Sequence, residues 1–595
     1  MFNGGRKNQA AEKSKDFGAS IRRLSRELRG AKILVILAIV FSIGGSVFTI
    51  LAPNKIATLT DEISKGLFGP IDINAVWAAA IFMILLYGGA ALFELAEGLT
   101  MAQASNGFAK ELRRRISRKI NRLPLKFFDN NQTGDILSRV TNDIDTVAQS
   151  LDNSLATLTS ESSIMLGTII MMFITNWTMA LVAVGASILG FIGVGAILGK
   201  SQKYFGMRQK ELGKLNAHIE EIYSGLLVVK AYNGKRESDK KFDRLNKRVY
   251  TANLRSQFLS GIMPPIMIFI GNLGYVAVCV TGALLVTNNA ITFGTIMAFI
   301  VYVRLFTSPL SRIAQSMSSL QAAAAASDRV FDFLDEDEMS DQKEIETRVD
   351  KDKIRGDIEF DHVRFGYNED KTIINDFSAE AKAGQKIAIV GPTGAGKTTM
   401  VNLLMKFYEL QDGDIRIDGI STRRMKREDV HSLFTMVLQD TWMFAGTLRD
   451  NIVYNRKGVS DEEIMKIMKT VGLEHFVKTL PKGLSSEISE SDSISAGQKQ
   501  LITIARGMVE DAPFLILDEA TSNVDTRTEE LVQKAMDKLM KGRTSFIIAH
   551  RLSTIKNADL ILVMNEGDIV ESGTHDQLMK QKGFYAELYN SQFSL

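Results

Sequence analysis

The sequence predicts two kinds of structure in one chain: an α-helical bundle with six membrane spans, followed by a soluble α/β domain. Three observations support this prediction. The first half holds six long apolar stretches, its positive charges gather on alternate sides of them, and the second half shows short β-branched runs alternating with helical patterns. A chain of 595 residues also exceeds what one hydrophobic core accommodates.

Six apolar stretches each approach the roughly 20 residues that cross about 30 Å of hydrocarbon. Few charges interrupt them, which disfavours the alternative of buried helices in a large soluble protein. The average composition conceals the difference between the apolar first half and the more polar second half, because over the whole chain the charges nearly cancel, to a net charge of +3. We place the spans at residues 33–52, 75–96, 158–174, 177–198, 262–286 and 291–306.

Basic residues indicate the orientation of these spans, because Lys and Arg are retained on the cytoplasmic side. They gather in residues 15–32, 110–118 and 200–214, whereas the turns at Asn176 and 287–290 carry no charge. We therefore expect a multi-pass protein of the cell membrane with both termini in the cytoplasm. The first thirty residues lack an apolar core and cleavage site, so we expect no removable signal peptide.

The two long inner segments are charged and helical in pattern, which predicts cytoplasmic extensions of the membrane helices. Each contains a break suited to a short transverse helix, at residues 131–135 and 223–225. These breaks could contact the soluble domain or could be plain helix–helix turns. Gly261, Pro264 and Pro265 should bend or unwind the start of the fifth span.

Four ionisable residues fall inside or near the spans, where charge is costly and usually faces a wet cavity. Substrate contact, a boundary position and an internal ion pair all remain open for Glu94, Glu97, Glu161 and Arg304. The single cysteine, Cys279, excludes an intramolecular disulfide. We divide the chain into an N-terminal segment (1–30), a membrane domain (31–325), a linker (326–356) and a soluble domain (357–595).

A phosphate-binding loop is predicted directly after a buried strand at Lys386–Val390. The pattern is G-x-x-x-x-G-K-[ST], with a helix after it, and this context disfavours a glycine-rich turn without a ligand. Backbone N–H groups curl around the β-phosphate, the lysine reaches the β and γ oxygens, and Thr398 ligates Mg²⁺. The loop consists of Gly391, Pro392, Thr393, Gly394, Ala395, Gly396, Lys397, Thr398 and Thr399.

Two adjacent carboxylates end a later apolar strand, Phe514–Asp518. Asp518 is placed to enter the Mg²⁺ shell, and Glu519 is placed to polarise the attacking water as a general base. A solvated turn is the alternative reading of such a pair. The phosphate loop upstream favours the interpretation that these carboxylates bind Mg²⁺ and activate water.

The ordered set of motifs resembles ABC exporters over essentially the entire length, specifically half-transporters that fuse a six-helix membrane domain to an ATP-binding P-loop NTPase cassette. The resemblance implies that Tyr367 stacks on adenine and that Gln439 senses Mg²⁺ and touches the membrane domain. It also implies that Asp525 lies in the loop coupling the two sites and that His550 contacts γ-phosphate. The segment 1–30 would then hold an elbow helix.

The resemblance further implies a second chain, because the signature loop caps the nucleotide held by the opposite cassette. That loop is Ile494, Ser495, Ala496, Gly497 and Gln498, against a family consensus of Leu-Ser-Gly-Gly-Gln. The added methyl of Ala496 restricts close backbone approach to phosphate. Because the catalytic motifs are intact, the chain resembles the catalytic member of a heterodimeric multidrug exporter. A heterodimer is favoured, and a homodimer stays possible.

The resemblance implies an ATPase coupled to transport, which exports amphipathic drugs, lipids or peptides across the membrane by alternating access with ATP and Mg²⁺. Import is disfavoured because importers usually keep the two domains on separate chains. A nucleotide-gated channel would lack continuous, substrate-stimulated ATP hydrolysis. Six spans exclude a soluble DNA-repair ATPase, so we expect no nucleic-acid partner. The cargo is not readable from the sequence.

One substitution tests the predicted general base. We expect Glu519→Gln to retain ATP binding yet nearly abolish turnover, because the water loses the carboxylate that polarises it. Steady-state hydrolysis and nucleotide binding of the purified protein measure the two effects. Unchanged hydrolysis would remove Glu519 from the catalytic role.

Overall fold

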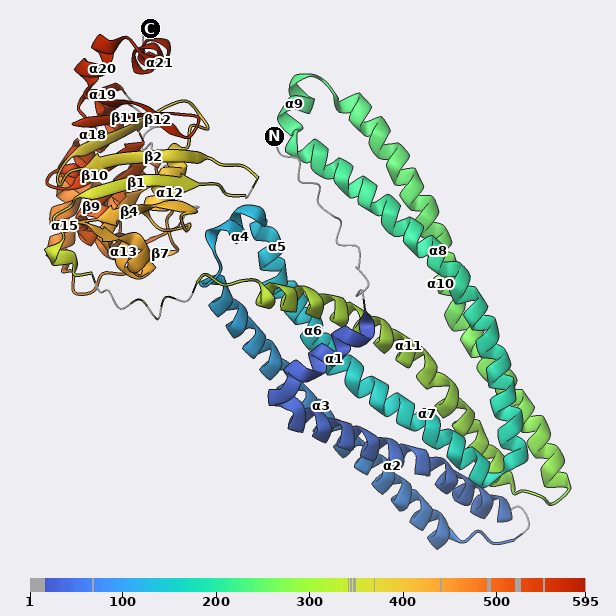
Figure 1. Cartoon of the computed structure of the whole chain (residues 1–595). Coiled ribbons are helices and arrows are strands. Elements are labelled where there is room, and N and C mark those ends of the chain that lie inside the picture. Colours follow the sequence, from blue (N-terminus) through green and yellow to red (C-terminus); the bar gives the residue numbers. More distant parts are fainter. Residues whose placement is uncertain are drawn as a thin grey trace. The chain divides into compact units, whose positions relative to one another are not determined.

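The computed structural model of the chain describes two compact units (Figure 1). Unit 1 comprises Met1–Arg122 and Gln132–Asp337, and unit 2 comprises Leu123–Asn131 and Glu338–Leu595. The described residues are 16–593, except 67–68, 341, 343–344, 346–348, 369, 439–440, 490–493, 519–525 and 549–551.

The described part of unit 1 consists of helices joined by short connections. Its first helix starts after Asp16, whose side chain accepts a hydrogen bond from the Ala19 amide at 3.1 Å and so caps the helix. The helices are α1 (Phe17–Glu27), η1 (Leu28–Ala31), α2 (Lys32–Lys65), α3 (Ile73–Ile120), α5 (Thr133–Ser138), η2 (Arg139–Asp143), α6 (Ile144–Ser150), η3 (Leu151–Leu155), α7 (Ala156–Thr175), α8 (Trp177–Ser224), α9 (Leu226–Ala231), α10 (Lys235–Thr287) and α11 (Phe293–Asp335).

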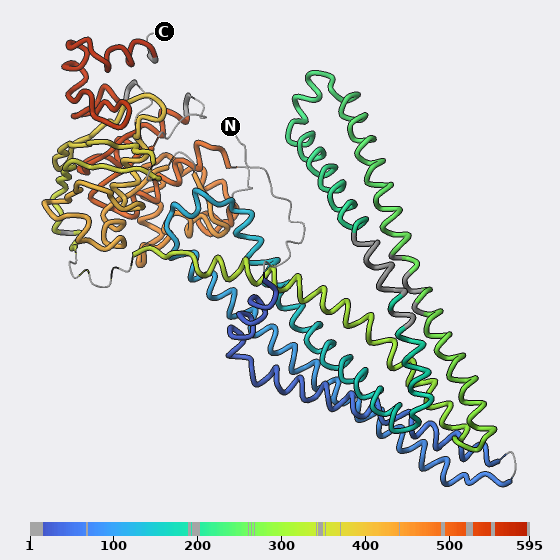
Figure 2. The backbone as a smooth tube through the Cα atoms, turned by 45° about the vertical axis from the view of Figure 1, so that its right-hand side comes forward, coloured from blue at the N-terminus to red at the C-terminus, as the bar shows by residue number. Residues whose placement is uncertain are grey.

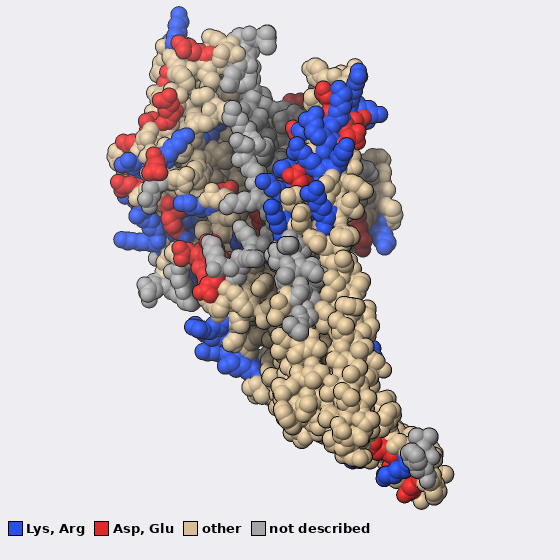
Figure 3. All heavy atoms as spheres, turned by 90° about the vertical axis from the view of Figure 1, so that its right-hand side faces the viewer, with Lys and Arg blue, Asp and Glu red and all other residues tan. Residues whose placement is uncertain are grey.

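Five helical segments among the described residues are long and apolar enough to cross a membrane. They are Phe17–Lys65, Ile73–Ile120, Thr133–Thr175, Ile268–Thr287 and Phe293–Asp335. A shorter apolar stretch, Trp177–Ile188, begins α8. Figure 3 shows a broad surface of the helical unit that carries almost no charged side chains. These features identify a multi-pass membrane protein and are compatible with the six predicted spans.

The long helices of unit 1 form two groups (Figure 2). Helices α8 and α10 run side by side and are joined by the short helix α9, while α2, α3, α7 and α11 form a second group. Helix α1 packs on α11, where Ser20 donates to Asp328 at 2.8 Å and Arg23 pairs with Asp335 at 2.6 Å. The break predicted at residues 223–225 separates α8 from α9.

Helix α10 corrects one prediction, because it continues without interruption through Gly261, Pro264 and Pro265. Of the two outcomes predicted there, a bend or an unwinding, the unwinding is therefore wrong, and the bend stays a prediction. Opening a helix within hydrocarbon exposes several backbone polar groups, which costs more than the one hydrogen bond that a proline removes. Pro53 and Pro309 likewise lie inside α2 and α11.

Helix α11 extends past residue 326, where we expected the linker to begin, and ends at Asp335. An alanine-rich stretch before this end has high helix propensity, and Ala323 and Ala324 are fully buried. Of the four ionisable residues singled out above, buried Glu161 forms an ion pair with Arg312 at 2.6 Å. Glu94 and Arg304 are exposed.

Unit 2 is an α/β domain with a mainly parallel sheet. That sheet has the order β12-β11-β3-β10-β9-β6, and a second, antiparallel sheet has the order β2-β1-β4-β5. The strands are β1 (Ile358–Phe365), β2 (Ile374–Ala381), β3 (Lys386–Val390), β4 (Asp412–Ile417), β5 (Ile420–Ser421), β6 (Phe434–Val437), β7 (Gly446–Thr447), β8 (Glu487–Ile488), β9 (Phe514–Asp518), β10 (Thr544–Ile548), β11 (Leu560–Asn565) and β12 (Asp568–Gly573).

Helices cover the parallel sheet, and apolar residues fill both of its faces. Along β3, Ala388 and Val390 join one hydrophobic cluster while Ile387 and Ile389 join another, which explains its unbroken apolar sequence. The helices of unit 2 as a whole are α4 (Leu125–Asn130), α12 (Lys397–Leu404), α13 (Arg427–Leu433), α14 (Leu448–Val453), α15 (Asp461–Thr470), α16 (Glu474–Thr479), α17 (Ala496–Glu510), α18 (Thr526–Met540), α19 (Leu552–Lys556), α20 (His575–Gln581) and α21 (Phe584–Phe593), with 3₁₀ turns at Lys351–Lys353, Thr422–Arg424 and Gly483–Ser485.

A half-buried histidine, His431, is expected to make the stability of unit 2 depend on pH. Burial lowers the pKa of His431 from its ordinary value of 6.5, and its Nε2 lies 2.9 Å from the Met405 carbonyl oxygen. Because the unfolded chain then binds more protons than the folded one, the stability contributed above pH 6.5 is lost as the pH falls.

We therefore expect His431→Gln to flatten the fall in melting temperature between neutral pH and about pH 5.5, because an amide can still donate to Met405 without titrating. Thermal unfolding of the full-length protein measures this effect. The matched control is His475→Gln, at an exposed position, which should leave the slope unchanged. An unaltered slope in the His431 variant would contradict the assignment.

Candidate nucleotide-binding site

The parallel register of three strands forms the edge on which the site is built. Ile548, at the end of β10, pairs with Ile389 of β3 on one side and with Asp518 of β9 on the other. The carboxyl ends of these strands therefore lie together. The loop after β3 and the carboxylate that ends β9 emerge at the same edge of the sheet.

The loop between β3 and α12 adopts a conformation that requires glycine. Gly394 and Gly396 have φ of +87° and +101°, in the region that L side chains rarely adopt. A Cβ on Gly396 would also lie 2.6 Å from Cδ1 of Ile374. Gly396 is the residue that precedes α12, so this backbone turn aims the helix N-terminus at the loop.

Lys397 is held inside the loop although it is charged. Its side chain is buried, and Nζ donates to the carbonyl oxygens of Gly391 at 2.8 Å and Pro392 at 3.0 Å. A buried ammonium needs such acceptors, because its desolvation is otherwise costly. These bonds keep the positive charge where a phosphate would approach the loop.

Tyr367 contacts α12, the helix that follows the phosphate loop. Its hydroxyl is 3.2 Å from Thr399 Oγ1 and accepts a hydrogen bond from Asn402 at 3.4 Å. Its ring meets Phe365 and Tyr408 edge to face, with centroids 5.1 and 5.0 Å away. The sequence-predicted adenine contact is thus beside the phosphate loop.

Tyr408 extends this aromatic cluster to α4, the short helix that precedes the break predicted at residues 131–135. The Tyr408 hydroxyl donates to Asp129 of α4. Burial, aided by this hydrogen bond, raises the pKa of Tyr408. Sequence reasoning missed Tyr408, because nothing in its neighbourhood distinguishes it from an ordinary core aromatic.

The oxygen donors at this edge fit a magnesium ion that also binds phosphate. Thr398 is exposed at the start of α12, and Asp518 is half-buried at the end of β9. Among the residues that the structure describes, no cluster of three or more His, Cys, Asp or Glu could hold a metal by itself. Mg²⁺ prefers hard oxygen ligands and usually takes few from protein, with the rest from phosphate and water.

The predicted signature loop forms the start of α17. Ser495 Oγ accepts from the Gln498 amide at 3.2 Å, and Gln498 Oε1 accepts from the Ser495 amide at 3.1 Å. This capping box secures the N-terminus of a 15-residue helix, whose positive end suits phosphate. Ala496 is exposed and Gly497 is buried.

Four predicted site residues lie outside the described residues: Gln439, Glu519, Asp525 and His550. Their roles stay predictions. The structure brings together the phosphate loop, Tyr367 and Asp518. Residues Ser495 to Gln498 lie elsewhere, at the start of a separate helix, α17, for which Ser495 is the N-cap.

One glycine tests whether this loop geometry matters. We expect Gly396→Ala to weaken ATP binding at least about tenfold, because a strained left-handed conformation costs of order 1–3 kcal/mol. Nucleotide titration of the purified protein measures this loss. Gly384→Ala is the matched control, because Gly384 also has positive φ (+77°) but its Cβ would meet nothing within 4 Å. Equal affinity losses in both variants would contradict a specific role for the loop.

Comparisons with known proteins agree with this arrangement. The family model of the ABC transporter transmembrane region matches residues 35–310, and the ABC transporter model matches residues 374–522. A fatty acid ABC transporter ATP-binding/permease protein of Mycobacterium tuberculosis is 40% identical, over 97% of each chain. An uncharacterized ABC transporter ATP-binding protein of Bacillus subtilis is 38% identical, over 98% of this chain and 95% of its own.

A more distant relative is an ATP-dependent lipid A-core flippase of Syntrophus aciditrophicus, 32% identical over 87% of this chain and 85% of its own. The chain therefore belongs to the ABC transporter family, as an exporter-type half-transporter that couples an ATPase cassette to a transmembrane domain.

Proposed function

We propose that this protein is one half of a dimer that exports lipid-like amphipathic molecules, with fatty acids as the first class to test. The glycine-dependent phosphate loop, in one chain with membrane helices, is the observation that carries the proposal. Two relatives support the substrate class, since one is named for fatty acids and another for a lipid A-core. Drugs and peptides are the remaining candidates.

The two short transverse helices support a dimer. Helix α4 is tied to unit 2 of its own chain by Tyr408 and Asp129. By contrast, the region of α9 exposes large apolar side chains: Tyr223 is 80%, Leu227 84% and Tyr232 84% exposed. Such a group at the end of a charged, cytoplasmic arm is typical of an interaction site. We assign it to the cassette of the partner chain.

The signature loop supports a heterodimer. Ala496 is exposed at the first position of α17, where the methyl group that replaces the consensus glycine would restrict the approach of a phosphate. The nucleotide site on the partner's phosphate loop, which this signature loop caps, would therefore bind or hydrolyse ATP less well than the site on this chain's own phosphate loop. A homodimer would instead carry this weakness in both of its sites.

ATP binding would rearrange the loop. Lys397 would exchange the carbonyl oxygens of Gly391 and Pro392 for β and γ phosphate oxygens. Thr398 and Asp518 would hold Mg²⁺, which would neutralise phosphate charge. Glu519 would act as general base, with Gln439, Asp525 and His550 in the roles that the family resemblance implies. ATP drives alternating access only if it favours the closed cassette dimer over the open one.

The basic segments support an orientation with both termini in the cytoplasm. We also propose a division into a membrane domain and a cassette, with the linker moved to follow the end of α11 at Asp335 and the cassette beginning near β1.

Transport into vesicles tests the proposal. The protein is copurified with its partner and reconstituted with the cassettes facing outward, and uptake of a labelled long-chain fatty acid is followed with Mg-ATP. We expect uptake by the wild type and none by Glu519→Gln. If fatty acids neither move nor stimulate hydrolysis while a cationic dye does, the lipid assignment is wrong. Recovery of an active complex that contains only this chain would overturn the heterodimer.

The proposed docking role of α9 makes a separate prediction. Leu227→Asp should lower substrate-stimulated ATP hydrolysis at least about tenfold, because a charge cannot replace the apolar contact, while ATP affinity stays unchanged. The control, Tyr250→Asp, alters an exposed residue (66%) of α10 away from α9. Equal behaviour of both variants in the hydrolysis assay would contradict the docking role.

A further inference from the structure

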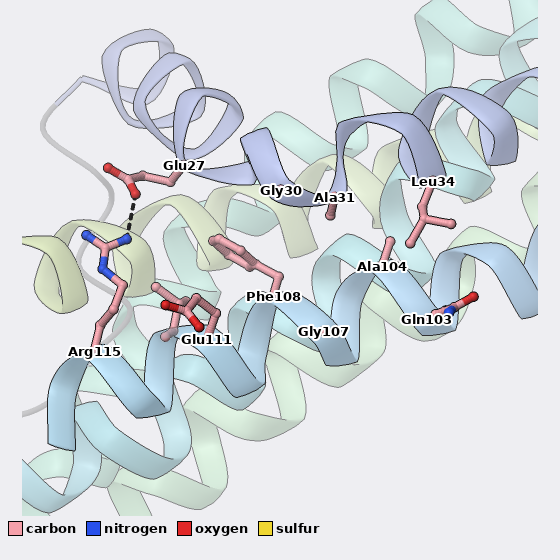
Figure 4. A pocket seen from close by; sticks show the side chains of 11 residues that line it. Glu27, Gly30, Ala31, Leu34, Gln103, Ala104, Gly107, Phe108, Glu111 and Arg115 are labelled. Atoms are coloured by element: carbon pink, nitrogen blue, oxygen red, sulfur yellow. Dashed lines mark hydrogen bonds and ion pairs between the residues drawn. The ribbon is translucent and has the colours of Figure 1, made fainter. Parts of the chain in front are cut away.

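A cavity of about 290 Å³ lies between the first helices of unit 1 (Figure 4). Its upper side comes from α1, η1 and the start of α2, and its lower side comes from α3. Gly30 and Gly107 face each other across it, and a Cβ built on either would meet nothing within 4 Å. Space is therefore left open at the points where the two sides carry no side chain.

The cavity is polar at one end and apolar at the other. At the polar end, Glu27 and Arg115 form an ion pair of 2.6 Å across it, with Glu111 beside them (Figure 4). Toward the other end it is lined by the apolar Leu34 and Ala104, with the amide side chain of Gln103 beyond Ala104 (Figure 4). An occupant that matches both ends has a polar head and an apolar chain.

Apolar surface continues from the apolar end along both helices. Leu37 of α2 follows Leu34 by one helical turn and is 41% exposed, and Leu99 of α3 precedes Gln103 by one turn and is 66% exposed. Both belong to segments apolar enough to span a membrane. An acyl chain that leaves the cavity in this direction remains in hydrocarbon.

The charged lining of the polar end consists of Glu27, Glu111 and Arg115, and further cations lie next to these lining residues in the sequence. Arg26 lies directly before Glu27, Arg29 lies beside Gly30, and Lys110 follows Gly107 by one turn of α3. All three are exposed and have no ion-pair partner among the residues that the structure describes. Arg22 and Lys32 share these properties. This excess of cations lies directly before the apolar part of α2, which is the position of a membrane–water interface.

We propose that this cavity binds an anionic phospholipid of the leaflet that faces the basic segments. The phosphate contacts Arg26 and Lys110, beside the Glu27–Arg115 pair, and an acyl chain follows Leu34, Ala104 and the exposed leucines beyond. The lipid is a resident ligand, separate from the exported cargo. It would join α1, which also packs on α11 through Ser20 and Arg23, to α3.

Filling the cavity tests the proposal. Full-length protein is reconstituted in phosphatidylcholine with a minor fraction of phosphatidylglycerol, and retained lipids are counted by native mass spectrometry. Gly107→Leu should reduce retained phosphatidylglycerol to the background level of phosphatidylcholine. Gly98→Leu is the matched control, because Gly98 lies on the opposite face of α3 and its Cβ also meets nothing within 4 Å. Equal retention by both variants would overturn the proposal.

Charge removal provides a second, independent test. Arg26→Gln and Lys110→Gln should each weaken phosphatidylglycerol retention about fivefold, since a basic residue near an anionic surface contributes about that factor. Lys247→Gln, at an exposed position of α10, is the control and should retain wild-type binding. Phosphatidylglycerol should also raise the melting temperature of the wild type but not of Gly107→Leu.

Two further results would overturn the proposal. Retention of phosphatidylcholine and phosphatidylglycerol in proportion to the bilayer would show that the site does not select anionic lipid. Loss of the retained lipid to the opposite leaflet during ATP turnover would make it cargo. Neither result depends on whether fatty acids are exported, so the two proposals fail separately.

Discussion

The site depends on the parallel register of β3, β10 and β9. Because Ile548 pairs with Ile389 and with Asp518, the phosphate loop and the carboxylate lie at one sheet edge although they are 121 residues apart between Lys397 and Asp518. Apolar side chains on both faces of β3 hold this register, since a slip would break two hydrophobic clusters at once. The chemistry of the site follows from a packing constraint.

The same edge is connected to α4 by a short series of contacts. Thr399 and Asn402 of α12 contact the hydroxyl of Tyr367, whose ring packs on Tyr408, and Tyr408 donates to Asp129. These contacts connect the helix that follows the phosphate loop to α4, which follows the membrane helix α3 in the sequence. Such a series of contacts couples two sites only when its side chains have two discrete arrangements.

Much of this could be predicted from the sequence, because it rests on local patterns. Apolar length marks the membrane helices, and the strand–loop–helix context marks the phosphate loop. The aromatic cluster around Tyr408 and the cavity beside Gly107 could not be predicted from the sequence, since both arise where segments distant in sequence meet. Of the bend or unwinding expected at Pro264 and Pro265, the unwinding does not occur, because the cost of exposing backbone in hydrocarbon outweighs the local preference of proline.

A double-mutant cycle tests the central claim that Thr398 and Asp518 bind the Mg²⁺ ion of the same bound nucleotide. ATP affinity is measured with and without Mg²⁺ for Thr398→Val, Asp518→Asn and the double variant. Two residues that hold one ion should give strongly non-additive losses with Mg²⁺, and little loss without it. Additive losses, or losses that persist when Mg²⁺ is chelated, would contradict the shared site and with it the account of the cassette.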